Sequence, residues 1–250
     1  TRGAVLSRGL GRSYGDSALP PASVAEVVAT RAADRMLSFD PDTGVLRAEA
    51  GLSLYRINRL LLERGWFVPV TPGTQFVTLG GMVAADVHGK GHHRVGCFGE
   101  HVTRLKMRVA DDRVLWCSDE QHPDLFLATI GGMGLTGHIV EVEFRMRRIP
   151  SPWIWQESWR IEDIDAYVPA LEQAAQRWPY TVGWIDCLTG GRGIGRGILM
   201  AGDWARADMA PRESPRRATR VTMPFEWPTW ALNRSSVRVF NEALYRSHPP

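Results

Sequence analysis

The segment from Gly73 to His93 reads GTQFVTLGGMVAADVHGKGHH. It begins with small and apolar residues and ends with three histidines and one lysine separated by glycines. Glycine lets the backbone approach a ligand closely, and histidine and lysine supply hydrogen-bond donors and titratable groups. The segment therefore predicts one wall of a binding site, with polar side chains at its end.

Lys90 is unusual in this composition. The chain has 30 Lys+Arg residues, yet only Lys90 and Lys106 are lysines. An ammonium group is a compact point charge, whereas a guanidinium is a planar fork of donors. A lysine in a glycine-rich loop of an arginine-rich chain indicates that a point charge is needed there.

The three histidines of this segment leave three interpretations open. His88 and His92 have the i, i+4 spacing of a helical zinc site, but Gly89 and Gly91 disfavour a helix and no glutamate lies between them. Solvated loop histidines are the second interpretation. The favoured one is an organic cofactor or substrate site faced by His88 and Lys90, and no metal site is predicted.

The composition is that of a folded chain. Its 250 residues, 44% hydrophobic and 23% charged, allow one large domain or two small ones. A net charge of +3 is too weak to argue for nucleic acid. Three cysteines without a CxxC pair predict reduced thiols and neither a disulfide framework nor a zinc site.

No apolar run is long enough to span a bilayer, and no signal peptide is recognisable. We therefore expect a cytoplasmic or peripherally membrane-associated protein. Thr1 already lies in a strand-like run, and Pro250 follows directly on a helical pattern. The chain is therefore expected to be a segment of a longer protein.

Local patterns predict a mixed α+β chain with short strands rather than the strand–helix alternation of a doubly wound sheet. One helix is expected to begin after Ser53, with apolar positions Leu54, Ile57, Leu60 and Leu61, and to end near Gly65. Another is expected from Asp124 to Ile130, after Pro123. The expected strands are Ala4–Ser7, Leu37–Phe39, Val45–Ala50, Trp66–Val70, Leu105–Ala110, Arg113–Cys117 and Ile139–Met146.

The pattern changes after the proline-bearing stretch 149–152, which predicts domains over residues 1–150 and 151–250. The second part is expected to contain alternating tryptophans at 153, 155 and 159, a helix at Ile161–Arg177, strands at Tyr180–Leu188 and Ile194–Met200, and a charged loop over 203–220. The aromatic run Met223–Leu232 indicates either a lipid- or substrate-facing surface or, for most of its tryptophans, packing inside this domain. The arginines at 206, 212, 216, 217 and 220 fit an anionic membrane or phosphate, or a solvated loop.

Two glycine clusters require separate interpretations. The run Gly132–Gly137 matches the dinucleotide fingerprint GxGxxG, but it follows a helix and precedes a strand, the reverse of the required context. A helix C-cap with a tight turn explains it better. Gly9–Arg12 follows a strand, so its amides form either an anion-binding nest or an ordinary turn. Lys90 is followed by Gly91 and not by Ser or Thr, so there is no Walker A loop.

Five segments in this order resemble the FAD-binding domain of the vanillyl-alcohol-oxidase, or PCMH-type, family. They are RGLGRSYGD (8–16), PGT (72–74), TLGG (78–81), HGKGHH (88–93) and GGMGLTG (131–137). The first and fourth are the most specific. The resemblance covers nearly the whole chain and weakens after about residue 190. It implies a PCMH-type domain of two α/β subdomains, followed by the start of an α+β substrate domain.

The resemblance also implies the roles of individual residues. The pyrophosphate loop would comprise Ser7, Arg8, Gly9, Leu10, Gly11, Arg12, Ser13, Tyr14, Gly15, Asp16 and Ser17. The rest of the flavin site would be lined by Gly73, Thr78, Leu79, Gly80, Gly81, Ala85, Asp86, Val87, His88 and Ile139. Tyr14, His88 and Lys90 would lie near the isoalloxazine as catalytic residues. Lys90 and Trp184 would contact the substrate.

Two departures from the family pattern carry expectations of their own. Many relatives attach flavin covalently through the histidine of a Gly-His-Ser-Tyr run, where this chain has Gly11-Arg12-Ser13-Tyr14, so noncovalent FAD is predicted. Val182 stands where a polar residue is expected, two residues before Trp184. The family also places cofactor contacts, including lysines, in a C-terminal part beyond Pro250.

Within the family, the greatest resemblance is to the flavoenzymes of arabinose-donor synthesis for cell-wall arabinan. It implies oxidation of the ribose 2′-hydroxyl of a polyprenyl-phosphoryl-β-D-ribose to a 2-keto product, which an NAD(P)H-dependent reductase partner then reduces. Peripheral membrane association and no nucleic-acid partner are expected. The alternatives are an alditol or aldonolactone oxidase of the same superfamily, and a truncated, inactive flavin-binding module.

Overall fold

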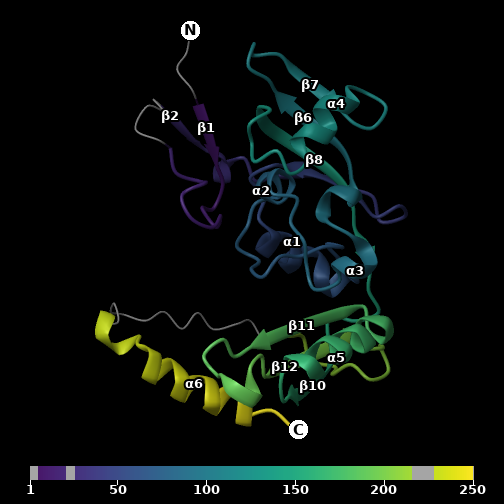
Figure 1. Cartoon of the computed structure of the whole chain (residues 1–250). Helices are drawn as coiled ribbons and strands as arrows, with labels where there is room; N and C mark the ends of the chain where they lie inside the picture. The colour runs from purple at the N-terminus through teal and green to yellow at the C-terminus, as the bar shows by residue number, and fades with distance from the viewer. Residues whose placement is uncertain (1–4, 21–25, 216–227, 250) are drawn as a thin grey trace. The chain divides into compact units, whose positions relative to one another are not determined.

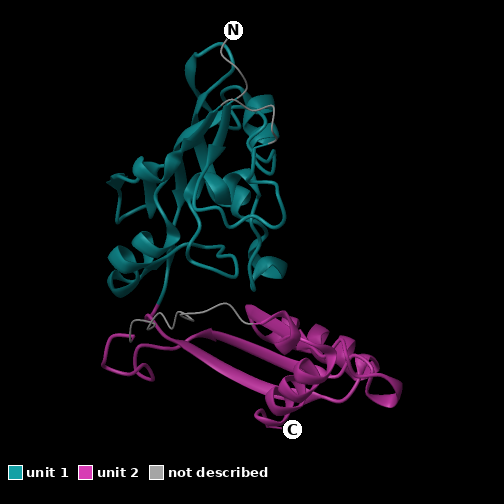
Figure 2. Ribbon diagram, turned by 90° about the vertical axis from the view of Figure 1, so that its left-hand side faces the viewer, with its two compact units in different colours: residues 1–149 teal, residues 150–250 magenta. Residues whose placement is uncertain are grey.

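The structure is a computed structural model of the 250-residue chain, and it describes residues 5–20, 26–215 and 228–249. The chain divides into two compact units, Thr1–Ile149 and Pro150–Pro250 (Figure 2). Helices and strands are mixed in both, which confirms the predicted α+β class.

Unit 1 is built on a five-stranded sheet with the strand order β3-β4-β8-β6-β7 (Figure 1). All four neighbouring pairs are antiparallel, and the hairpins β3–β4 and β6–β7 fall where strands are predicted. Antiparallel pairing throughout rules out a doubly wound parallel sheet here. The strands are β3 (Met36–Phe39), β4 (Val45–Glu49), β6 (Val102–Arg108), β7 (Val114–Cys117) and β8 (His138–Arg145).

Two small sheets accompany the main one. β1 (Val5–Arg8) pairs in parallel with β2 (Glu26–Ala29), which has no counterpart among the predicted strands. β5 (Trp66–Phe67) pairs with β9 (Arg147–Arg148). The strand predicted at Trp66–Val70 is therefore shorter than expected, because the buried residues after Phe67 pair with no strand.

The helices of unit 1 largely follow the predicted signals. α1 (Leu54–Leu61) begins after Ser53, whose hydroxyl accepts the N–H of Arg56, and the following turn ends at Gly65 in the left-handed conformation. Of the four apolar positions, Leu54, Ile57 and Leu61 are buried, whereas Leu60 is 44% exposed. The others are α2 (Leu79–Ala84), α3 (His92–Val95) and α4 (Pro123–Thr129), with 3-10 turns η1 (Thr30–Ala32), η2 (Leu62–Arg64) and η3 (Phe98–His101).

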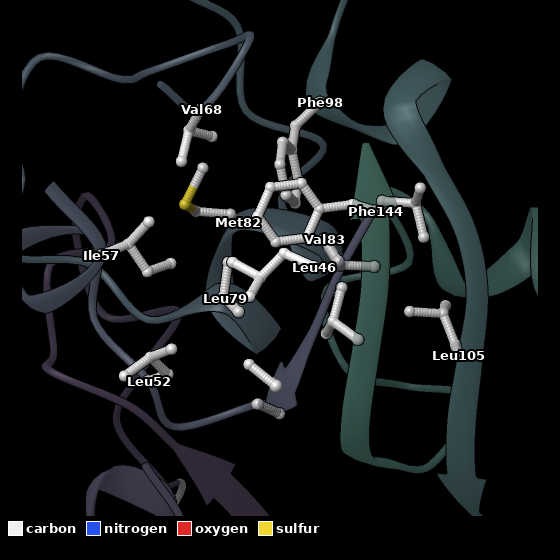
Figure 3. Close-up of a cluster of buried hydrophobic side chains, with 14 of the residues drawn as sticks. Leu46, Leu52, Ile57, Val68, Leu79, Met82, Val83, Phe98, Leu105 and Phe144 are labelled. Carbon is white, nitrogen blue, oxygen red and sulfur yellow. The ribbon is translucent and has the colours of Figure 1, made fainter. Parts of the chain in front are cut away.

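The core of unit 1 lies between the main sheet and α2. Leu79, Met82 and Val83 of α2 point toward Phe98 and Phe144, whose rings meet edge to face with centroids 5.2 Å apart (Figure 3). Each of these five side chains is fully buried. Burial of such side chains stabilises the fold by about 1.5–3 kcal/mol each, so α2 is firmly anchored.

Unit 2 is a three-stranded antiparallel sheet, β10-β12-β11, with α5 packed on one face. Its elements are β10 (Ile154–Ile161), α5 (Ile164–Arg177), β11 (Tyr180–Ile185), η4 (Gly191–Gly193), β12 (Gly197–Trp204), η5 (Thr229–Ala231) and α6 (Arg234–Arg246).

Element ends in unit 2 differ from those predicted. The helix begins at Ile164 rather than Ile161, because Ile161 ends β10 and Asp163 caps the helix by accepting the N–H of Ala166. β11 ends at Ile185 and β12 begins at Gly197, since the residues between them form the turn around Asp186. Residues 216–220 of the predicted charged loop and 223–227 of the aromatic run lie outside the described residues.

Hydrogen bonds to the Asp186 carboxylate connect α6 to this sheet. Its buried carboxylate accepts hydrogen bonds from the Leu188 N–H, the Thr189 hydroxyl, the Arg196 guanidinium and the Asn241 side chain of α6. Burial alone would raise the pKa of Asp186, but these four donors outweigh it and hold the pKa well below its ordinary value of 3.8.

Replacing Asp186 with alanine is expected to destabilise unit 2 by about 3 kcal/mol, because Arg196 and Asn241 lose their shared acceptor. A depressed pKa adds stability that is complete above pH 3.8 and declines as pH falls below it. Urea unfolding between pH 3 and 7 measures both effects. Asp208→Asn, which removes only the exposed pair of Asp208 with Arg206, serves as control; an equal loss in the control would contradict the assignment.

Among the described residues, no helix has the length and apolarity needed to cross a bilayer.

Candidate functional site

Helix α2 contributes the central surface of the candidate site. Its first turn is fastened to the preceding chain: Leu79 N–H donates to Leu52 O (2.9 Å), Gly80 N–H to Ala50 O (2.8 Å), and Gly81 N–H to the Thr78 hydroxyl (3.3 Å). While Leu79, Met82 and Val83 are buried, Gly81 and the following Ala85 are exposed. The helix thus presents a smooth surface of small residues and has no free donor in its first turn.

The loop from Gly9 to Ser17 reaches the start of this helix. A Cβ at Gly9 would lie 2.4 Å from Oγ1 and 3.1 Å from Cγ2 of Thr78, so only glycine fits without a shift. This packing brings together the RGLGRSYGD (8–16) and TLGG (78–81) motifs, which lie 62 to 73 residues apart in sequence.

The backbone donors of this loop are free within the described structure. Its internal hydrogen bonds run from Leu19 N–H to Asp16 O and from the Ser17 hydroxyl to Tyr14 O. The amides from Gly9 to Tyr14 donate to no described residue, and Gly11 has a φ of +63°. Unpaired amides in such a turn, with the Arg8 guanidinium over Gly11, favour an anion-binding nest over an ordinary turn. We therefore call residues Gly9–Ser17 the nest loop.

The third glycine-rich loop, Gly131–Gly137, lies at the other end of α2. Gly131 N–H donates to Val83 O (3.0 Å) and Met133 N–H to Ala84 O (2.8 Å). Gly131 has a φ of +72° just after α4, and β8 follows the loop. This order confirms the helix C-cap interpretation over the dinucleotide fingerprint. Leu135 of this loop is 90% exposed.

His88 and Lys90 extend beyond the C-terminal end of α2, and both side chains are exposed. Gly89 between them lies against the Thr71 carbonyl. His92 Nδ1 lies 3.0 Å from Gly89 O, and the His92 ring contacts the His88 ring edge to face. α3 begins only at His92, so these two histidines share no helix. The described residues contain no group of His, Cys, Asp and Glu side chains that could hold a metal ion.

The two lysines have different environments. Lys106 donates to Glu141 at 3.0 Å, and Glu141 also accepts from Arg47, on a face of the main sheet where Trp116 contacts Arg47 and Lys106. The ammonium of Lys90 forms no ion pair in the described part of the chain. Lys106 is therefore structural, whereas Lys90 is available to an anion.

The remaining residues predicted to line the flavin site differ in how deeply they are buried. Leu79 and Ile139 are buried in the core, so only their main chains could face a cofactor. Val87 packs against the same core, and Gly73 is exposed. One carboxylate oxygen of Asp86 accepts Gly99 N–H at 2.8 Å and its main-chain N–H donates to Val83 O at 3.0 Å, which leaves the second carboxylate oxygen for a cofactor contact.

Tyr14 is not brought to His88 by any described contact. The Tyr14 ring is 99% exposed at the tip of its loop and packs against neither His88 nor Lys90. Trp184 lies on β11 in unit 2, on the opposite sheet face from Gly183, which points at Tyr167 of α5. Val182 lies on the same sheet face as Trp184. The roles of Tyr14 and Trp184 remain predictions.

His138 is the polar residue that the sequence reasoning missed. Its Nδ1 lies 2.7 Å from the Ser7 hydroxyl, at the start of the nest loop. The sequence feature that could have indicated His138 is its position, directly after the glycine-rich loop and directly before Ile139, which was predicted to line the flavin site.

Loop amides free for an anion, a glycine-containing helix and an unpaired lysine after its end are features that a site for a phosphate-bearing organic cofactor requires. Residues 1–118 match the family described as "FAD binding domain". This part of the chain therefore belongs to the PCMH-type FAD-binding family, and its cofactor is FAD.

Among curated proteins, the chain is 30% identical to decaprenylphosphoryl-beta-D-ribose oxidase of Mycolicibacterium smegmatis over 97% of its own length and 54% of the relative. It is 34% identical to a putative D-arabinono-1,4-lactone oxidase of Neurospora crassa over 45% of this chain and 20% of that protein. A Delta(24)-sterol reductase of Rattus norvegicus is 28% identical over 44% and 22%, respectively. The chain thus spans about half the length of this mycobacterial relative.

Proposed function

We propose that this chain forms part of an FAD-dependent oxidoreductase that oxidises a sugar hydroxyl. The carrying observation is the Gly9–Ser17 loop, whose free amides adjoin the small-residue surface of α2. The loop amides and Arg8 would hold the pyrophosphate, and Gly81, Ala85 and the main chain around them would hold the flavin. When bound, FAD supplies a hydride acceptor.

His88 and Lys90 would serve the substrate. An exposed imidazole beside the proposed flavin site can orient the reacting hydroxyl or accept its proton. The unpaired ammonium of Lys90 can hold a phosphate or stabilise developing alkoxide charge. We propose the contact of His92 with the His88 ring as support for that ring's orientation.

We further propose noncovalent attachment of FAD, because the described loop carries Arg12 and no histidine. The purified protein is expected to be yellow and to release its flavin into the supernatant on acid precipitation. Absorbance before and after precipitation measures this. A flavin that stays with the pellet would contradict noncovalent binding, and a colourless protein would contradict the cofactor site.

The proposed substrate is a polyprenyl-phosphoryl-β-D-ribose, oxidised at the ribose 2′-hydroxyl to the 2-keto product. The name of the mycobacterial relative and the free charge of Lys90 support it. The keto product would pass to an NAD(P)H-dependent reductase partner, and the lipid-linked substrate favours peripheral membrane association. This activity would belong to arabinose-donor synthesis.

A second candidate is an oxidase of free alditols or aldonolactones, favoured by the likeness to the lactone oxidase. A third is a flavin-binding module without turnover. Anaerobic reduction of the bound flavin distinguishes them. We expect bleaching near 450 nm with the lipid-linked ribose and none with free alditols or lactones; the opposite pattern supports the second candidate, and bleaching with neither supports the third.

A further inference from the structure

His138 and Ser7 connect the two glycine-rich loops beside α2. Ser7 belongs to β1 and lies two residues before Gly9, where the nest loop begins. His138 is the first residue of β8 and follows Gly137, where the other loop ends. The distance of 2.7 Å between Ser7 Oγ and His138 Nδ1 is that of a good hydrogen bond.

The position of the nest loop depends on such connections. β1 and β2 form a parallel sheet of only two four-residue strands, and an isolated two-stranded sheet is marginally stable at best. Among the described residues, Ser7–His138 is the hydrogen bond that joins β1 to the five-stranded sheet. The Gly9 contact with Thr78 supplies packing but no hydrogen bond.

The protonation state of His138 suits this connection. The ring is half-buried, and burial together with the nearby charge of Arg108 lowers its pKa, so it is neutral at neutral pH. A neutral imidazole has one donor and one acceptor nitrogen. When Nδ1 carries the proton it donates to Ser7 Oγ, and the serine hydroxyl can then donate to an anionic oxygen.

We infer that His138 is a positioning residue for the cofactor, acting through Ser7 to hold the nest loop in its binding conformation. This inference rests on the proposed FAD site and adds a residue outside the resemblance. Of the proposed pyrophosphate loop, His138 contacts Ser7, and its effect reaches the cofactor through the serine hydroxyl and the strand that bears it.

The test is a double-mutant cycle on FAD affinity, measured by flavin fluorescence on the apo-protein. Ser7→Ala and His138→Phe are each expected to raise the Kd about tenfold, the effect of one lost hydrogen bond. The double variant is expected to match the single ones, because both remove the same bond. His138→Asn, whose amide can replace Nδ1, is expected to return the Kd to within about twofold of the starting value. Controls are Ser38→Ala and His122→Asn, both at exposed positions outside the site.

Unchanged Kd values in the single variants would overturn the inference, as would independent effects that multiply to about a hundredfold in the double variant. Failure of His138→Asn to rescue would assign the residue to packing alone. Hydrogen exchange of residues 9–17 in the apo-protein provides a second readout, expected to quicken in His138→Phe while the β8 core amides stay protected. If the unaltered protein binds no FAD, the proposed function fails, and this exchange measurement still decides the role of His138.

Discussion

Replacement of His88 by alanine is expected to leave FAD bound and to slow reduction of the flavin by substrate about 10²–10⁴-fold, the usual contribution of a positioned general acid or base. His88 is exposed beyond the end of α2, and no described hydrogen bond of the fold uses its ring, so its loss removes only the edge-to-face contact with the His92 ring from the fold. Stopped-flow absorbance near 450 nm under anaerobic conditions measures the rate.

The matched control is His122→Asn, at another exposed histidine before α4. Asparagine tolerates the left-handed backbone there, with φ of 53°, so folding is expected to be retained. Flavin content should be equal in all three proteins. Unchanged reduction kinetics in His88→Ala would remove His88 from the catalytic group, and loss of flavin would instead make it a cofactor-binding residue.

A methyl group at Gly9 is expected to weaken FAD binding about a hundredfold, the scale of effect that a displacement of about 1 Å can have at a positioned site. In Gly9→Ala the new carbon would meet the Thr78 hydroxyl at 2.4 Å, so either the nest loop or the cap of α2 must move. Titration of the apo-protein with FAD measures the loss, and circular dichroism checks that the fold is retained.

The structure offers a suppressor for this change. Thr78→Ala removes the two atoms that clash and leaves only its Cβ, 3.3 Å from the new carbon, so Gly9→Ala/Thr78→Ala should recover part of the affinity. Recovery is expected to be incomplete, because the lost N-cap costs about 1 kcal/mol. Gly190→Ala, where a Cβ meets nothing within 4 Å, is the control. Equal affinity in Gly9→Ala and the unaltered protein would contradict the close approach.

Local signals predicted most of unit 1 because its elements carry caps and turns in their own sequence. Ser53 before α1, Pro123 at α4 and Gly131 after it each act within a few residues. β2 was missed because its residues are exposed and its partner, β1, lies about 20 residues earlier in the chain. Pairing at such a distance leaves no periodic pattern to read.

The same distinction applies to the site. The sequence indicated His88 and Lys90 because their residue types are unusual in a glycine-rich loop. It could not show that Lys90 is unpaired while Lys106 is bound to Glu141, since that depends on which strand lies beside β6. Nor could it connect Ser7 with His138, 131 residues apart.

The fastening of α2 has a consequence for how the cofactor binds. The core side chains and the three hydrogen bonds of its first turn hold this helix in place, so its shape is set by the fold itself. The nest loop has two internal hydrogen bonds and a largely exposed tip, so it is the part that must lose conformational freedom on binding. Fixing one residue's backbone costs about 1–2 kcal/mol. In the proposed site, substitutions that stiffen this loop in the bound shape are therefore expected to tighten FAD binding without altering any contact to the flavin.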